Sequence, residues 1–275
     1  MSQFQDKTVW VTGASSGIGR ALAVAFSAAG AKTVLSGRRT EALQAVAEGL
    51  PTEAFVLPFE VTDYDALPGL VDKAWDWAGT VDILVNNAGV SQRSLAIKTD
   101  PQVYTDLINI DLIAPIWLTQ LQLPRMVKAG GAHIIAISSV AGRIGPPLRT
   151  AYAAAKHGLI GYMDSLRTEV SVRHNIHVTN VLPGSVATDV SRNALTADGS
   201  SRGKSDANIE GGDDPADLAK EILQAVMDKT PELIFAKGME FEAAKQRQSN
   251  PDALFEMMNQ MGAQIAERYE AGDDA

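Results

Sequence analysis

The stretch Lys7-Thr8-Val9-Trp10-Val11-Thr12-Gly13-Ala14-Ser15-Ser16-Gly17-Ile18-Gly19 decides the fold of this 275-residue chain. Its first part, residues 7–12, is a short run of mostly β-branched and apolar residues, which is typical of a buried strand. A glycine turn follows, and the alanine-rich residues 18–29 then predict a helix that ends at Gly30. A strand, a glycine turn and a helix in this order indicate an α/β protein.

The rest of the chain repeats this alternation of strand and helix. Short apolar runs predict further strands at residues 32–35, 54–59, 83–85, 133–138, 176–182 and 233–235. Helical patterns separate them, at residues 40–48, 64–77, 101–128, 150–173 and 215–227. Repeated β-α-β units with short apolar strands predict a doubly wound parallel sheet of about seven strands, with helices on both faces. We expect one domain, residues 1–275.

Two segments depart from the alternation. Residues 188–214 are rich in glycine and polar residues, and we expect a long mobile loop over a substrate site, with simple disorder as the alternative. Residues 239–270 predict a helical C-terminal extension with an apolar stripe made of Leu254, Met258, Met261, Ile265 and Tyr269. The stripe favours packing on the domain or on a partner subunit over contact with a membrane.

Composition and charge exclude several classes of function. Hydrophobic residues make up 45% and charged residues 21% of the chain, as in an ordinary soluble enzyme, and we expect a cytoplasmic protein without membrane spans. A net charge of −9 argues against nucleic acid as a partner. The chain has no cysteine and its four histidines lack metal-ligand spacing, so we predict neither thiol chemistry nor a bound metal.

The glycine turn at residues 13–19 matches two kinds of site. Residues 13–17 fit the G-x-S-x-G nucleophile elbow of hydrolases, but only twelve residues precede the turn, too few for the strands and oxyanion loop that come before such an elbow. A P-loop is excluded because no Gly-Lys-Ser/Thr follows. The alternative is phosphate binding, because glycines let the backbone approach a pyrophosphate and the helix N-terminus attracts its charge.

A second motif offers acid–base chemistry. Tyr152 and Lys156 lie four residues apart, so a helix places them side by side on one face. A phenol beside an ammonium group loses its proton more readily than an isolated phenol, and it can act as a general acid or base near neutral pH. The spacing is common by chance, with a surface helix pair as its ordinary interpretation. Its weight therefore depends on the motifs that accompany it.

Together the motifs resemble the short-chain dehydrogenase/reductase family. The matching segments follow that family's order: Thr-Gly-x-x-x-Gly-x-Gly at 12–19, Asn86-Asn87-Ala88-Gly89, Asn109, Ser139, Tyr152-x-x-x-Lys156, and Pro183-Gly184 followed by Thr188. The resemblance covers the chain to about residue 190. It implies a Rossmann-type fold and an oxidoreductase that interconverts a ketone or aldehyde and a secondary or primary alcohol by hydride transfer with a nicotinamide cofactor. It also implies a homo-oligomer, either a tetramer or a dimer.

The resemblance implies four catalytic residues. Tyr152 is expected to be the general acid/base, and Ser139 to hold the substrate oxygen, with Ser138 as the neighbouring candidate. Lys156 is expected to lower the pKa of the Tyr152 phenol and to bind the nicotinamide ribose. Asn109 is expected to anchor a water molecule that links Lys156 to solvent.

The remaining motif residues are expected to bind the cofactor, together with Tyr152 and Lys156. They follow the first strand and the later strands of the sheet: Gly13, Ser15, Ser16, Gly17, Ile18, Gly19, Glu60, Val61, Asn87, Ala88, Gly89, Pro183, Gly184, Val186 and Thr188.

Cofactor preference depends on the end of the second strand. Many NAD enzymes carry an acidic residue there, which binds the adenosine ribose hydroxyl groups. Ser36-Gly37-Arg38-Arg39 has no acid and offers guanidinium groups to a 2′-phosphate instead. We therefore expect NADP(H), with Arg38 as the main phosphate ligand and Arg39 assisting, and NAD(H) as the alternative.

The substrate is a small molecule whose identity these motifs leave open. Residues expected to line its pocket are Ser91, Gln92, Arg93, Ile144, Arg149 and Ser185. Arg93 or Arg149 could pair with an anionic substrate, and the ordinary alternative for either is a solvated surface charge. A second function also stays open, a dinucleotide-binding sensor without turnover. It is disfavoured because all four predicted catalytic residues are present.

Overall fold

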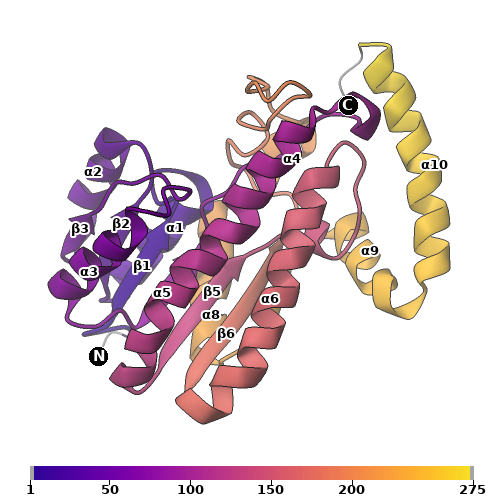
Figure 1. Ribbon diagram of the computed structural model, residues 1–275. Helices are drawn as coiled ribbons and strands as arrows, with labels where there is room; N and C mark the ends of the chain where they lie inside the picture. The colour runs from indigo at the N-terminus through magenta and orange to yellow at the C-terminus, as the bar shows by residue number, and fades with distance from the viewer. Residues whose placement is uncertain (1–2, 273–275) are drawn as a thin grey trace.

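The computed structural model describes residues 3–272, and a single parallel β-sheet forms its centre (Figure 1). The strands run in the order β3-β2-β1-β4-β5-β6-β7, and each neighbouring pair is parallel. Their bounds are β1 Thr8–Thr12, β2 Lys32–Ser36, β3 Ala54–Val56, β4 Ile83–Asn86, β5 Ala132–Ile137, β6 Ile176–Pro183 and β7 Glu232–Phe235. The predicted sheet of about seven strands is confirmed. Of the predicted range 1–275, the first two and last three residues lie outside the described part.

Alternate side chains of β1 belong to two separate cores, because successive residues of a strand point to opposite faces. Val9 and Val11 pack on one face with α1 (Gly17–Ala28) and α8 (Pro215–Met227). Trp10 packs on the other face, and its indole N–H donates to Ser36 Oγ at 2.9 Å. All five residues of β1 are buried, as expected of a strand covered on both faces.

Helices cover both faces of the sheet (Figure 1). On the face that holds Val9 and Val11, α1 and α8 are joined by α2 (Thr40–Glu48). On the face that holds Trp10, the covering helices are α3 Leu67–Ala78, α5 Ala114–Ala129 and α6 Thr150–His174. This arrangement is the doubly wound Rossmann architecture, which places the carboxyl ends of all strands along one edge.

The helix predicted over 101–128 is interrupted. It consists of α4 (Pro101–Ile108), a π-helical turn (Asn109–Ile113) and α5. Pro115 has no N–H to donate to a carbonyl in the preceding turn, so the regular hydrogen-bond pattern cannot continue there. The N–H of Ala114 instead reaches the carbonyl of Asn109, five residues back. Single π-helical turns of this kind often occur at functional sites.

The two segments outside the alternation are both structured. Residues 188–214 contain the short helix α7 (Ala207–Glu210) and isolated β-bridges such as Leu195 to Ser201. The predicted extension over 239–270 forms α9 (Gly238–Ser249) and α10 (Pro251–Glu270), the yellow helices of Figure 1.

The apolar stripe of α10 packs on the body of the protein at one end only. Leu254 is buried against Val140 and Ile144, whereas Met261, Ile265 and Tyr269 stay partly exposed. Among residues 3–272, no helix combines the length and the hydrophobicity needed to cross a membrane.

We expect Leu84→Ala in the central strand β4 to lower the free energy of unfolding by about 3 kcal/mol, because truncation leaves a cavity where Leu84 is fully buried. Urea denaturation followed by circular dichroism measures this change. Ile97→Ala is the control, since Ile97 is 84% exposed, and it should stay within about 0.5 kcal/mol of wild type. Equal losses in the two variants would contradict the assignment of Leu84 to the core.

Candidate active site

The glycine turn lies at the carboxyl end of β1, where the strand order reverses between β1 and β4. Gly13 and Gly17 have φ values of 66° and 52°, which other residues rarely adopt. A Cβ on Gly13 would lie 2.8 Å from Asn87 Nδ2, and one on Gly19 would lie 2.3 Å from the Gly13 carbonyl oxygen. The turn therefore requires glycine both for its backbone conformation and for its contact with the segment after β4.

The start of α1 fits a phosphate group. The helix begins at Gly17, and its first N–H groups have no carbonyl partner within the helix. In the described part of the chain, the side chain of Ser16 forms no capping hydrogen bond to them. These donors, together with the positive end of the helix dipole, can hold the pyrophosphate of a dinucleotide.

The two arginines after β2 take different partners. Arg39 Nη2 donates to Ser15 Oγ at 3.0 Å and to Ser16 Oγ at 2.9 Å, so Arg39 lies against the glycine turn. Arg38 Nη1 lies 3.5 Å from Glu60 Oε2, with 72% of its side chain exposed. Of the two guanidinium groups, the one that contacts the turn is therefore that of Arg39.

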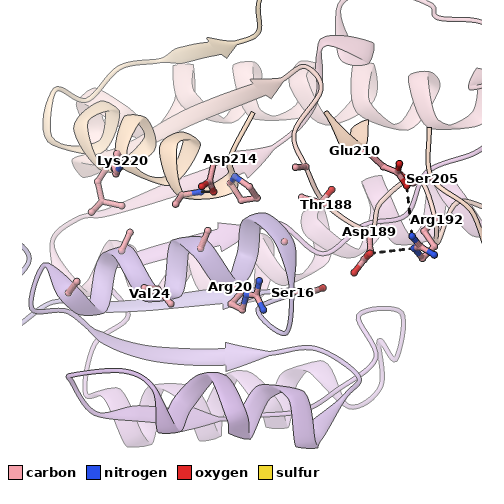
Figure 2. Close-up of a pocket in the computed structure, with 18 of the residues that line it drawn as sticks. Ser16, Arg20, Val24, Thr188, Asp189, Arg192, Ser205, Glu210, Asp214 and Lys220 are labelled. Atoms are coloured by element: carbon pink, nitrogen blue, oxygen red, sulfur yellow. Dashed lines mark hydrogen bonds and ion pairs between the residues drawn. The ribbon is translucent and has the colours of Figure 1, made fainter. Parts of the chain in front are cut away.

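A large cavity lies beside the glycine turn, between α1 and α8 (Figure 2). It is a groove of about 940 Å³ that extends from Ser16 and Thr188 to Val24 and Lys220. Tyr152 does not line it; within residues 3–272 the predicted acid–base residues line a second cavity, of about 100 Å³, that shares Thr188 with the groove. We place the chemistry in this second cavity, named the catalytic cavity below.

The catalytic cavity brings the sequence motifs together from four parts of the chain. Predicted residues that line it are Ile18, Asn87, Gly89, Ser139, Tyr152, Lys156, Pro183, Gly184, Val186 and Thr188. They come from the start of α1, the segment after β4, the end of β5 with α6, and the end of β6. All of these lie along the carboxyl edge of the sheet, where open α/β sheets bind ligands.

Lys156 is buried with its ammonium group close to a carboxylate. Its Nζ lies 3.2 Å from Asp111 Oδ2, donates to the Ile137 carbonyl at 3.1 Å and lies 5.5 Å from the centre of the Tyr152 ring. Burial by itself lowers the pKa of Lys156, but the opposing effects of Asp111 and Tyr152 are larger, so the pKa is raised above its usual value. The ammonium beside Tyr152 is therefore charged at neutral pH.

The residue that reaches Lys156 from the π-helical turn is Asp111, whereas the sequence predicts Asn109 for this position. Asp111 lines the catalytic cavity, whereas Asn109 does not. The backbone carbonyl of Asn109 accepts a hydrogen bond from the Tyr64 hydroxyl at 3.3 Å. Residues two apart on a helix do not share a face, so only one of the pair could point to Lys156.

Both serines at the end of β5 line the cavity, and their hydroxyl groups have different hydrogen-bond partners. Ser138 Oγ donates to the carbonyl of Lys156 at 3.1 Å and so supports the backbone of α6. Ser139 Oγ accepts the N–H of Ala141 and donates to the Pro183 carbonyl at 3.3 Å, a long bond that a substrate oxygen can replace. Ser139 is therefore the better placed donor.

A buried group of charges fastens residues 188–214 to the rest of the protein. Arg93 Nε donates to Asp206 Oδ2 at 2.8 Å, and both side chains are 5% exposed. Arg202 also pairs with Asp206, and Arg149 lies 3.3 Å from it. Burial lowers the pKa of Arg93 to about 10. Burial raises the pKa of Asp206, but hydrogen bonds and charge from Arg93 and Arg202 hold it well below its usual range.

Comparisons with known proteins agree with this geometry. The family model described as short chain dehydrogenase matches residues 7–199, well over half of the chain.

The chain belongs to the short-chain dehydrogenase family.

Relatives of this short-chain dehydrogenase include "Dehydrogenase/reductase SDR family member 7B" of Danio rerio, 40% identical over 84% of this chain and 78% of the relative. The protein of the same name from Bos taurus is 36% identical over 92% and 81%. A crystal structure of a short-chain dehydrogenase/reductase from Burkholderia phymatum, in complex with NAD, has the same fold. Its TM-score is 0.82 at 21% identity, over 92% of this chain and 96% of that one.

None of the six residues predicted to line the substrate pocket of this short-chain dehydrogenase lines the catalytic cavity. Arg93 is buried and Arg149 is 24% exposed, and both pair with Asp206 rather than stand free for an anionic substrate. The other four contact neighbouring structure instead. Gln92 Oε1 accepts the N–H of Ala151, and Ser91 Oγ accepts a hydrogen bond from Arg93. Ser185 Oγ donates to Glu240, and Ile144 packs with Leu254.

Several residues of the cavity were missed by sequence reasoning. Val90, Val190 and Ile209 supply apolar wall, and Asp111 supplies the carboxylate. The sequence offered one signal for the wall residues, since Val190, Leu195 and Ile209 are large apolar residues in a mostly polar segment. Asp111 gave no signal, because its burial depends on the π-helical turn.

We expect Asp206→Asn to loosen residues 188–214, because three guanidinium groups would lose the carboxylate that holds them. Limited proteolysis followed by mass spectrometry should show cleavage within this segment at least about tenfold faster than in wild type, the effect of roughly 1.4 kcal/mol of easier opening. The control is Glu210→Gln, because Glu210 is exposed and its carboxylate lies as far as 4.0 Å from Arg192. Equal cleavage rates in wild type and Asp206→Asn would contradict this role.

Proposed function

We propose that this short-chain dehydrogenase is an NADP(H)-dependent oxidoreductase that interconverts a ketone or aldehyde and an alcohol, with Tyr152 as general acid/base. The observation that carries the proposal is that Tyr152, Ser139 and a charged, buried Lys156 line one cavity beside the glycine turn. When bound, the nicotinamide would supply the hydride for reduction or accept it in oxidation.

The residues of the cavity would divide the remaining work. Tyr152 Oη gives its proton to the carbonyl oxygen in reduction and takes it back in oxidation. Ser139 Oγ exchanges its long bond to Pro183 for one to the substrate oxygen and so orients it. The ammonium of Lys156 stabilises the phenolate that remains and is the candidate donor to the nicotinamide ribose. Val190 and Ile209 exclude water from the reacting atoms.

NADP(H) is supported by the absence of an acid directly after β2 and by the arginines that stand there. Arg39 is held by neutral serines, so its charge is available to a 2′-phosphate, whereas the charge of Arg38 is partly balanced by Glu60. We therefore assign Arg39, rather than Arg38, as the main ligand of the 2′-phosphate. NAD(H) is the alternative cofactor, and the Burkholderia phymatum structure of the same fold holds NAD.

We also propose that the protein assembles as a homodimer or homotetramer through the helices of 101–128 and α6. Trp117 on α5 is 44% exposed and Val172 on α6 is 100% exposed, as is common for residues at subunit contacts.

Tyr152→Phe should lower kcat/KM for carbonyl reduction by at least about 100-fold, because it removes the acid and leaves the ring. Initial rates of NADPH oxidation with a panel of ketones and diketones measure the loss. Tyr162→Phe is the control on the same helix, since its hydroxyl bonds Gln120 away from the cavity. Cofactor binding without turnover in wild type, on every ketone and on alcohols in the reverse direction, would favour the sensor.

Arg39→Ala should raise KM for NADPH about tenfold or more and leave KM for NADH nearly unchanged, because it removes a charged partner of the 2′-phosphate alone. Arg38→Ala should have the same effect to a smaller degree. Steady-state kinetics with both cofactors test this, with Lys32→Ala at the far end of β2 as the control. Wild-type preference for NADH would overturn the cofactor assignment and leave the role of Tyr152 intact.

A further inference from the structure

Asp111 is a buried carboxylate that joins three parts of the catalytic cavity. Its side chain has no exposed surface, and its two oxygens take different partners. Oδ1 accepts the backbone N–H of Val90 at 2.8 Å, and Oδ2 lies 3.2 Å from the ammonium of Lys156. Gly89 makes room for it, since a Cβ there would lie 3.2 Å from both oxygens. The π-helical turn, the segment after β4 and α6 thus converge on one carboxylate.

The charges within the cavity are few. Among the described residues that line it, only Asp111, Tyr152 and Lys156 can ionise. Two titratable groups on the surrounding elements have other partners. The Tyr64 hydroxyl donates a hydrogen bond to the Asn109 carbonyl, and His157 Nδ1 is hydrogen-bonded to the Ala153 carbonyl. The segment after β4 and the end of β5 contribute no charged side chain to the lining. Lys156 therefore lies between two ionisable partners, Asp111 and Tyr152, with few other charges nearby.

We propose that Asp111 is a positioning residue that balances the charge of Lys156, so that the site favours proton donation from Tyr152 to a carbonyl. This inference rests on the proposed function of Tyr152. It assigns the chain a bias toward reduction that comes from its own residues and is separate from the cofactor preference.

Asp111 sets the net charge of this buried site. With the Asp111 carboxylate and the Lys156 ammonium paired, the site is neutral while Tyr152 is protonated, and loss of the phenol proton leaves a buried negative charge. With a neutral residue at position 111 and Lys156 still protonated, the site carries a positive charge that loss of the phenol proton cancels. A buried net charge is unfavourable, so the proton leaves at lower pH when Asp111 is replaced.

The test is Asp111→Asn, which keeps the shape and the acceptor for the Val90 N–H and removes the charge. We expect the alkaline fall in kcat/KM for ketone reduction to move about one to two pH units lower, the size expected for a unit charge acting across a buried site. Asp106→Asn is the matched control, because Asp106 is a partly exposed carboxylate on the preceding helix α4 that accepts a hydrogen bond from the Gln102 side chain. Its profile should coincide with that of wild type.

A direct titration separates this inference from the proposed function. The chain has five tyrosines, and subtracting the tyrosinate absorbance of a matched Tyr152→Phe variant isolates the signal of Tyr152 in each background. The isolated signal should appear at lower pH in Asp111→Asn than in wild type, whether or not a substrate has been found. If Asp111→Asn does not fold, as judged by circular dichroism, Asp111→Ser replaces it.

An unchanged or alkaline-shifted Tyr152 titration in a folded variant would overturn the role of Asp111, and would mean that the carboxyl is already neutral in wild type or acts on packing alone. A shifted titration in a protein with no turnover would leave the inference standing and reject the proposed function.

Discussion

The close approach of the turn after β1 to the segment after β4 is the constraint on which the rest of the structure depends. Thr12 Oγ1 accepts the N–H groups of Asn87 and Ala88 at 2.9 and 3.0 Å and donates to the Val85 carbonyl at 3.1 Å. One hydroxyl from the end of β1 thus satisfies three backbone groups at the end of β4. The strand order reverses at this point, so the contact also sets the floor of the crevice that the glycine turn and the catalytic cavity share.

That contact explains why the turn after β1 requires glycine. Gly13 and Gly19 lie against Asn87, where any Cβ would collide with the amide or with the turn itself. On the other side, Gly89 leaves space for Asp111 rather than for the cofactor turn. The same short segment after β4 therefore connects the cofactor side of the site to the charge that acts on Lys156.

The two buried ion pairs have different roles: one lies beside the reacting groups, and the other holds the segment that encloses the site. Lys156 and Asp111 lie inside the cavity, where their mutual charge acts on the phenol of Tyr152. Arg93 and Asp206 lie outside it and fix residues 188–214, which carry Val190 and Ile209 of the cavity wall. Buried pairs of this kind add little net stability against apolar replacements, so their placement is better explained by what they position.

The order of strands and helices, the glycine turn and the Tyr152-Lys156 pair could be predicted from the sequence because each depends on local physics. Periodicity predicts an element, and four-residue spacing places two side chains on one helix face. The identity of the helix residue beside Lys156, the partner of Asp206 and the different contacts of Arg38 and Arg39 were decided only by tertiary structure. They depend on the π-helical turn at Pro115 and on contacts between segments as far apart as residues 93 and 206, which no local pattern encodes.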